Sequence, residues 1–156
     1  LVQWQVRPYY KVEELLKQVE YFVDAVSDYQ SDFILFPELF NAPLMGRYNN
    51  LESRQAIKEL AQFTEPIAEA MAKMAVSYNV NIIAGSMPQI REGEVYNVAY
   101  ILQRNGKVDT VDKIHITPSE AYEWQIRGGK EIKVIETDVA RIGVQICYDV
   151  EFPELG

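Results

Sequence analysis

Residues 32–38 read Asp-Phe-Ile-Leu-Phe-Pro-Glu, a short apolar run that ends at a proline and a carboxylate. A continuous apolar run of this length, stopped by proline, predicts a strand that is buried on both faces. It follows residues 11–30, where apolar side chains recur at helical spacing and charged side chains occupy the opposite face. This helix and strand begin an alternation that continues along the chain, and they place Glu38 where the buried strand meets its loop.

The remaining segments extend this alternation of helices and strands. Residues 1–6 alternate apolar and polar side chains, which predicts a strand already in progress, and residues 38–50 are rich in turn formers. The other expected elements are a helix from Pro66 to Tyr78 capped by Thr64, a strand at 80–85, a hairpin of 95–104 and 107–113 around Asn105-Gly106, a loop or single helical turn at 116–129, and strands at 133–136 and 141–147. This order predicts one α/β domain with a mixed sheet.

Composition excludes several classes of protein. The 156 residues carry a net charge of −8 without any basic cluster, so a nucleic-acid partner is not expected. No apolar run approaches the ~18 residues that span a bilayer, so no membrane partner is expected either. One cysteine excludes an internal disulfide and fits a cytoplasmic location, and one cysteine with one histidine does not make a zinc site.

Both ends of the sequence suggest a longer protein. The first residue is Leu1 rather than methionine, and residues 152–156 begin an element without completing it. We therefore expect residues 1–156 to be part of one domain whose C-terminal part is absent. A further domain upstream of Leu1 is left open.

The thiol of Cys147 follows residues 141–146, a run that predicts a strand delivering it to the rim of a sheet. A free cysteine is often a small buried hydrophobe, and a nucleophilic one needs a base or a cation nearby. His115 is the only histidine, so a Cys-His pair depends on that one residue. Glu38 and Lys113 each end another predicted strand and could also help the thiol, although both could instead be solvated surface charges. Ligands of open α/β sheets bind outside the carboxyl ends of the strands, so these side chains could converge there.

A glutamate, a lysine and a cysteine have a coherent division of labour. The carboxylate takes the thiol proton and returns it to a leaving amine, while the thiolate attacks a carbonyl or nitrile carbon. The ammonium stabilises the developing oxyanion, and the backbone N–H of Tyr148 could act as a second donor. This chemistry predicts an acyl-enzyme intermediate on Cys147.

Three motifs resemble the nitrilase superfamily of carbon–nitrogen hydrolases, in that family's order and at similar separations. They are Phe36-Pro37-Glu38, Lys113-Ile114-His115, and residues 143–149 followed by Phe152-Pro153-Glu154. The resemblance implies Glu38 as general base, Lys113 as the cation that stabilises the oxyanion, and Cys147 as nucleophile. It also makes His115 a structural residue of the lysine motif.

Many members of this family use a second glutamate in the loop after the lysine. Glu120 and Glu123 are the candidates, and we favour Glu120 because residues 118–120 (Pro-Ser-Glu) could start a helical turn that fixes the side chain. Many relatives carry arginine where Glu151 stands here, so the charge near the mouth of the site differs.

The resemblance further implies a four-layer αββα sandwich, of which this chain covers the N-terminal half to three-fifths, in a homodimer or larger homo-oligomer. It implies a hydrolase that cleaves the carbon–nitrogen bond of a small amide or N-carbamoyl compound without a cofactor, through a thioester on Cys147 with release of ammonia or an amine. Acyl transfer to an amine is the enzymatic alternative, and a non-catalytic binding or assembly module is the other. The identity of the substrate is left open.

Overall fold

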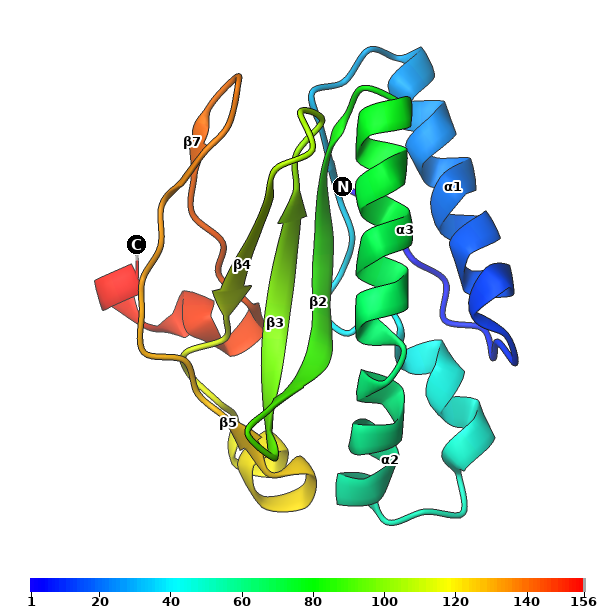
Figure 1. Cartoon of the computed structure of the whole chain (residues 1–156). Coiled ribbons are helices and arrows are strands. Elements are labelled where there is room, and N and C mark those ends of the chain that lie inside the picture. Colours follow the sequence, from blue (N-terminus) through cyan, green and yellow to red (C-terminus); the bar gives the residue numbers. More distant parts are fainter. Residues whose placement is uncertain (156) are drawn as a thin grey trace.

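A mixed sheet lies between a layer of helices and a second, smaller layer (Figure 1). The structure is a computed structural model, and it describes residues 1–155. Strand β1 (Phe33–Leu35) pairs in parallel with β2 (Asn81–Arg91), and β2, β3 (Glu94–Leu102) and β4 (Val108–Asp112) follow one another antiparallel. Where β4 has ended, β5 (Ile126–Arg127) pairs in parallel with the start of β3. The sheet therefore gathers segments from most of the chain.

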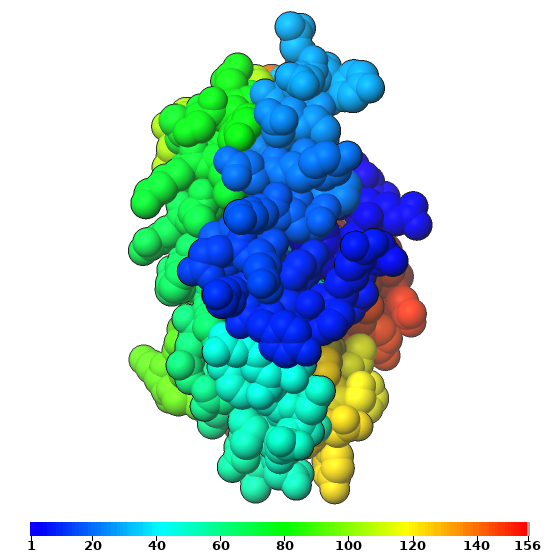
Figure 2. Space-filling view, turned by 90° about the vertical axis from the view of Figure 1, so that its right-hand side faces the viewer, coloured from blue at the N-terminus to red at the C-terminus, as the bar shows by residue number. Residues whose placement is uncertain are grey.

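The helical layer is formed by α1 (Val12–Asp28), α3 (Thr64–Ser77), α2 (Ser53–Ala61) and the 3-10 helix η1 (Ala42–Tyr48). Helix α2 lies at the lower end of α3 in Figure 1. The buried face of α1 is a stripe at i, i+4 and i+8, consisting of Leu15, Val19 and Val23. Figure 2 shows the outer side of this layer, where the N-terminal segment and α1 cover the sheet. Within residues 1–155, no helix is both long and apolar enough to cross a membrane.

The side chains of β3 alternate between two cores. Val98, Tyr100 and Leu102 pack under the helices, whereas Ala99 and Ile101 face the second layer. There the core is smaller and is completed by Val111, Ile135 and Ile146. Because successive strand residues point to opposite faces, the side chains of β3 are buried on both faces of the sheet.

The second layer contains the short hairpin of β6 (Ile135–Glu136) and β7 (Arg141–Ile142), which lies on the side of the sheet opposite the helices (Figure 1). Two 3-10 helices, η3 (Cys147–Glu151) and η4 (Pro153–Leu155), follow it. The chain after β7 thus returns toward the sheet and brings Cys147 with it.

Most predicted elements form, but four expectations were wrong. Residues 1–6 form no strand and are tied to β1 through one backbone bond, from the N–H of Val2 to the carbonyl of Leu35. Leu35 itself is 38% exposed, so β1 is not buried on both faces. Thr64 is the first residue of α3 rather than its cap, because its hydroxyl donates to the carbonyl of Pro88.

The fourth error concerns the last predicted strands, which shrink to two residues each. Residues 143–146 have strand-like composition but no ladder partner among residues 1–155.

Two helices were not predicted: α2, whose buried side chains are Ala56, Ile57 and Leu60, and η1 within the predicted loop. Residue 156, at the end of the predicted final element, lies outside the described residues.

Candidate active site

Lys113 lies between two carboxylates on the sheet face toward the second layer. Its side chain is only 1% exposed, and its Nζ is 2.8 Å from Oε1 of Glu38 and 2.9 Å from both carboxylate oxygens of Glu120. Glu38 follows β1, Lys113 follows β4, and Glu120 begins a π-helical turn, η2 (Glu120–Trp124). The fold thus brings together three charged side chains from separate parts of the chain.

Close backbone packing fixes Lys113 at this point. Its N–H donates to the carbonyl of Asn97 at 2.9 Å, and its carbonyl accepts from the N–H of Gly129 at 2.8 Å. A Cβ on Gly129 would lie 2.5 Å from the Cβ of Asp112, so glycine is needed for this approach. Burial alone would lower the pKa of Lys113, but hydrogen bonds to Glu120 and Glu38 outweigh it and hold the pKa above its ordinary value. Lys113 therefore stays protonated near neutral pH.

A bulge in β2 holds the backbone around Glu38. Gly85 adopts φ +52°, and a Cβ there would lie 1.8 Å from the carbonyl oxygen of Pro37. The adjacent Ser86 accepts a hydrogen bond from the N–H of Leu39 at 3.1 Å through its Oγ. Because β2 contacts the chain on both sides of Glu38, the backbone of Glu38 is held in place even though it lies in a loop.

Asn97 is a site residue that the sequence did not reveal. It is fully buried on β3, and its Nδ2 donates to Oε1 of Glu38 at 2.9 Å, the same oxygen that accepts from Lys113. Both donors therefore orient one oxygen of Glu38. The available signal was a polar residue inside an otherwise apolar strand, because a buried amide needs a partner.

Of the two candidate second glutamates, the structure brings Glu120 to the lysine and leaves Glu123 exposed. One oxygen of Glu120 also accepts from the backbone N–H and the hydroxyl of Thr117, at 2.9 and 2.8 Å. Burial raises the pKa of Glu120, but the bonds from Lys113 and Thr117 outweigh it, so the pKa lies below its ordinary value. The carboxylate is thus held as an anion in one orientation.

Cys147 begins η3 rather than ending a strand, and its φ of +52° is unusual for a residue with a side chain. The thiol is exposed and lines a cavity of about 200 Å³ together with Glu38. Partial desolvation, followed by the charge and hydrogen bond of Glu38, raises the pKa of Cys147, while Lys113 opposes this. The thiol is therefore protonated near neutral pH and lies beside a group that can accept its proton.

The single histidine contacts other parts of the nucleophile motif. The rings of His115 and Phe152 stack with centroids 3.5 Å apart and planes 4° apart, and Nδ1 of His115 is 3.1 Å from Oδ1 of Asp149. Tyr148, the predicted backbone donor, is the second residue of η3, and its ring packs edge-on against Phe152. These contacts join the lysine motif to the cysteine motif.

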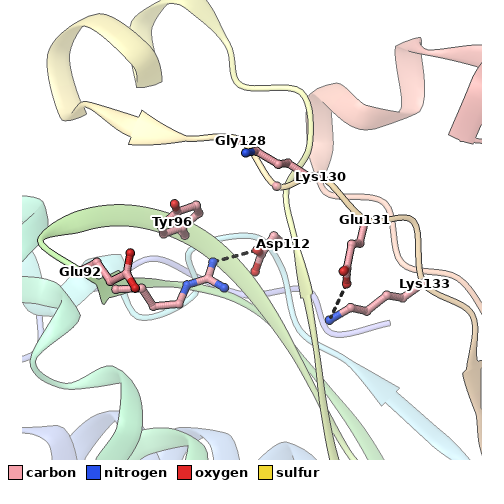
Figure 3. Close-up of a pocket in the computed structure, with 9 residues that line it drawn as sticks. Glu92, Tyr96, Asp112, Gly128, Lys130, Glu131 and Lys133 are labelled. Carbon is pink, nitrogen blue, oxygen red and sulfur yellow. Dashed lines mark hydrogen bonds and ion pairs between the residues drawn. The ribbon is translucent and has the colours of Figure 1, made fainter.

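A second cavity, of about 720 Å³, lies at the edge of the sheet and contains none of the candidate catalytic side chains (Figure 3). Four of its charged groups form two pairs: Arg91 binds Asp112 at 2.8 Å and lies over the ring of Tyr96, and Lys133 is 3.8 Å from Glu131. Within residues 1–155, no group of three or more His, Cys, Asp or Glu side chains is arranged to hold a metal ion. The cavity lined by Glu38 and Cys147 is therefore the candidate site.

Comparison with known proteins gives a consistent family. The sequence profile of the carbon-nitrogen hydrolase family matches residues 1–155. "Probable hydrolase YhcX" of Bacillus subtilis is 42% identical over 155 residues, which are 99% of this chain and 30% of that protein. The 2-oxoglutaramate amidase of the same organism is 29% identical over 94% of this chain and 54% of its own length.

Solved structures share the fold. A carbon-nitrogen hydrolase from Helicobacter pylori superposes with a TM-score of 0.79 at 20% identity, over 97% of this chain and 52% of that chain. An amidase of the nitrilase superfamily from Nesterenkonia superposes with a TM-score of 0.78 at 18% identity, over 98% and 57% of the two chains. The predicted mixed α/β fold is confirmed, and the chain spans about half or less of the length of these relatives. This chain belongs to the carbon-nitrogen hydrolase family, within the nitrilase superfamily.

Proposed function

We propose that the protein containing this chain is an amidohydrolase that cleaves a non-peptide carbon–nitrogen bond in a small amide or N-carbamoyl compound. The observation that carries the proposal is the position of Lys113, which is buried between Glu38 and Glu120 while Cys147 shares a cavity with Glu38. This arrangement supplies a base, a fixed cation and a nucleophile within one site. A cytoplasmic location and a homo-oligomeric assembly remain predictions from composition and from the family resemblance.

The first half of the proposed reaction forms a thioester. Glu38 accepts the proton of the Cys147 thiol as the sulfur attacks the carbonyl carbon, and negative charge develops on the carbonyl oxygen. Lys113 and the backbone N–H of Tyr148 stabilise this oxyanion, since N–H groups in a first helical turn have no acceptor within the helix. Glu38 then gives its proton to the departing nitrogen, and ammonia or an amine leaves.

The second half regenerates the enzyme. Water attacks the thioester carbon and transfers a proton to Glu38, and the tetrahedral intermediate collapses to a carboxylic acid while the sulfur regains its proton. Glu120 stays ionised beside Lys113 throughout, and its role is to hold the cation and the substrate in position. The raised pKa of Cys147 fits this scheme because the thiol loses its proton only as it attacks.

The names of relatives support the substrate class. Two relatives are named 2-oxoglutaramate amidase and omega-amidase, and both names describe cleavage of small amides. A solved amidase from Nesterenkonia shows Michael addition of acrylamide at its active-site cysteine. We carry the reaction class and the cysteine nucleophile from these proteins to this chain as a proposal.

The test is ammonia release from a panel of small linear amides and N-carbamoyl compounds, using the full-length protein. Acid quenching followed by intact-mass measurement should detect an acyl group on Cys147. Product analysis with an added primary amine separates hydrolysis from acyl transfer, because a transferring enzyme yields mainly the new amide and a hydrolase mainly the carboxylic acid. A folded full-length protein that neither releases ammonia nor reacts with a thiol reagent at Cys147 would instead be a non-catalytic module.

A further inference from the structure

Asp149 lies two residues after the nucleophile and is 2% exposed. Its Oδ1 accepts a hydrogen bond from the backbone N–H of His115 at 2.7 Å, and its Oδ2 accepts one from the backbone N–H of Ile146 at 3.1 Å. The N–H of Asp149 itself donates to the carbonyl of Ile146 at 3.2 Å, so the two residues bond reciprocally. One buried carboxylate therefore spans two segments that are far apart in the sequence.

Both residues that donate to Asp149 lie within two residues of a proposed catalytic side chain. His115 is two residues after Lys113, and Ile146 is the residue immediately before Cys147. The segment from 143 to 146 has no strand ladder among residues 1–155, so its end is not aligned by sheet hydrogen bonds. The bond from Ile146 to Asp149 is a local substitute, and it closes the turn in which Cys147 has a positive φ.

We propose that Asp149 is a positioning residue, which sets the thiol of Cys147 in register with Lys113 and Glu38. This inference rests on the proposed function for its effect on turnover, but its structural content does not. Asp149 acts through the backbone, because both of its oxygens are engaged by N–H groups. Only a carboxylate offers an acceptor to both N–H groups at once, since a side-chain amide has one acceptor oxygen and turns a donor toward the other N–H.

A second set of contacts strengthens the same connection. The ring of His115 faces Asp149 through Nδ1 and stacks on Phe152, and the side chain of Gln145 donates to the carbonyl of Leu155 at 2.7 Å. The first two of these contacts link His115 and Phe152 to the carboxylate, which is itself only 2% exposed. A buried charge held by charge-assisted hydrogen bonds is a rigid junction, because either oxygen loses a partner if the segments separate.

The test compares Asp149→Asn with Asp109→Asn in the full-length protein. Asp109 makes the control matched, because it lies on β4 before Lys113 and its carboxylate accepts from Gln103 and pairs with Lys107, away from the site. We expect Asp149→Asn to lower kcat roughly 10- to 100-fold while KM changes little, and Asp109→Asn to leave both unchanged. Asp149→Glu should not restore kcat, because the extra methylene moves both oxygens away from the N–H groups of His115 and Ile146.

The pH profile of Cys147 alkylation by iodoacetamide is the second readout, and it needs no turnover. The groups that act on this thiol are Glu38, which raises its pKa together with desolvation, Glu120, which also raises it, and Lys113, which lowers it. If Asp149→Asn releases the turn, the thiol moves relative to Glu38, Glu120 and Lys113, and the midpoint of the profile shifts away from the wild-type value. Asp109→Asn should keep the wild-type midpoint.

The outcomes separate the two proposals. An alkylation midpoint and a kcat that both match wild type in folded Asp149→Asn would overturn the positioning role. If wild-type protein releases no ammonia but the midpoint still shifts, the proposed function fails and the positioning role stands. Should Asp149→Asn not fold, amide hydrogen exchange on the wild type decides, because free exchange at His115 or Ile146 contradicts the junction.

Discussion

The two halves of the candidate site are built differently. Lys113 is 1% exposed and is held by main-chain hydrogen bonds within the sheet, whereas Cys147 is exposed on a short 3-10 helix beyond the sheet. The charged groups are thus fixed by the sheet and its neighbours, while the position of the proposed nucleophile, Cys147, depends on a local turn.

This difference indicates which substitutions should change folding stability and turnover together, and which should change turnover alone. Changes to the buried charges should affect folding and turnover together, because an unpaired buried charge is costly. Changes to the exposed thiol should affect turnover alone. The following predictions, for the full-length protein, test this comparison.

The largest expected effect is on the exposed side. Cys147→Ala should lower turnover at least about 10⁴-fold, because no other thiol can form the acyl intermediate. Its thermal midpoint should stay near wild type, since little packing is lost at an exposed position. Ammonia release and a thermal melt measure the two quantities, and a large drop in the melting temperature would show that Cys147 is a packing residue instead.

On the buried side, Lys113→Met should destabilise the protein by about 3–5 kcal/mol, because Glu38 and Glu120 are left facing each other without a cation. Denaturant unfolding measures this, and the control Lys107→Met should cost under about 1 kcal/mol because its ion pair is exposed. The double variant Lys113→Met/Glu120→Gln should regain part of the stability but no activity. Equal stability of Lys113→Met and wild type would break the comparison.

Asn97→Ser removes one of the two donors to Oε1 of Glu38. The loss of a hydrogen bond to a charged group, worth about 1.5–3 kcal/mol, predicts a kcat roughly 10- to 100-fold lower. Gln89→Ala is the control, since it removes a comparable amide–carboxylate bond to Glu65 on the exposed surface. If both variants keep full activity, Asn97 does not orient the base.

The smallest expected effect is a shift in the pKa of Cys147, which tests the electrostatic coupling between the two regions. Glu38→Gln removes a charge that raises the pKa of Cys147, so the pKa should fall and alkylation should begin at lower pH. The sign is informative because turnover should be lost while the thiol becomes easier to ionise. An alkylation profile that does not move would mean that Glu38 and the thiol are not electrostatically coupled.

Much of the fold could be predicted from the amino-acid sequence. The helical stripe at 11–30 and the turn at Asn105-Gly106 predicted α1 and the β3–β4 hairpin, because these signals are local. α2 was missed, and the strand expected to end at Cys147 was wrong, since β-branched composition cannot show whether a ladder partner exists.

For the site, the sequence by itself determined the types of reactive group and their order along the chain, because spacing and motif are properties of the chain alone. Only the tertiary structure decided which atoms meet. Asn97 reaches Glu38 across 59 residues, and Asp149 reaches His115 across 34. The choice of Glu120 over Glu123 likewise depended on which side chain the turn directs toward Lys113. Hydrogen bonds between distant segments need a geometry that exists only after the sheet and its second layer have come together.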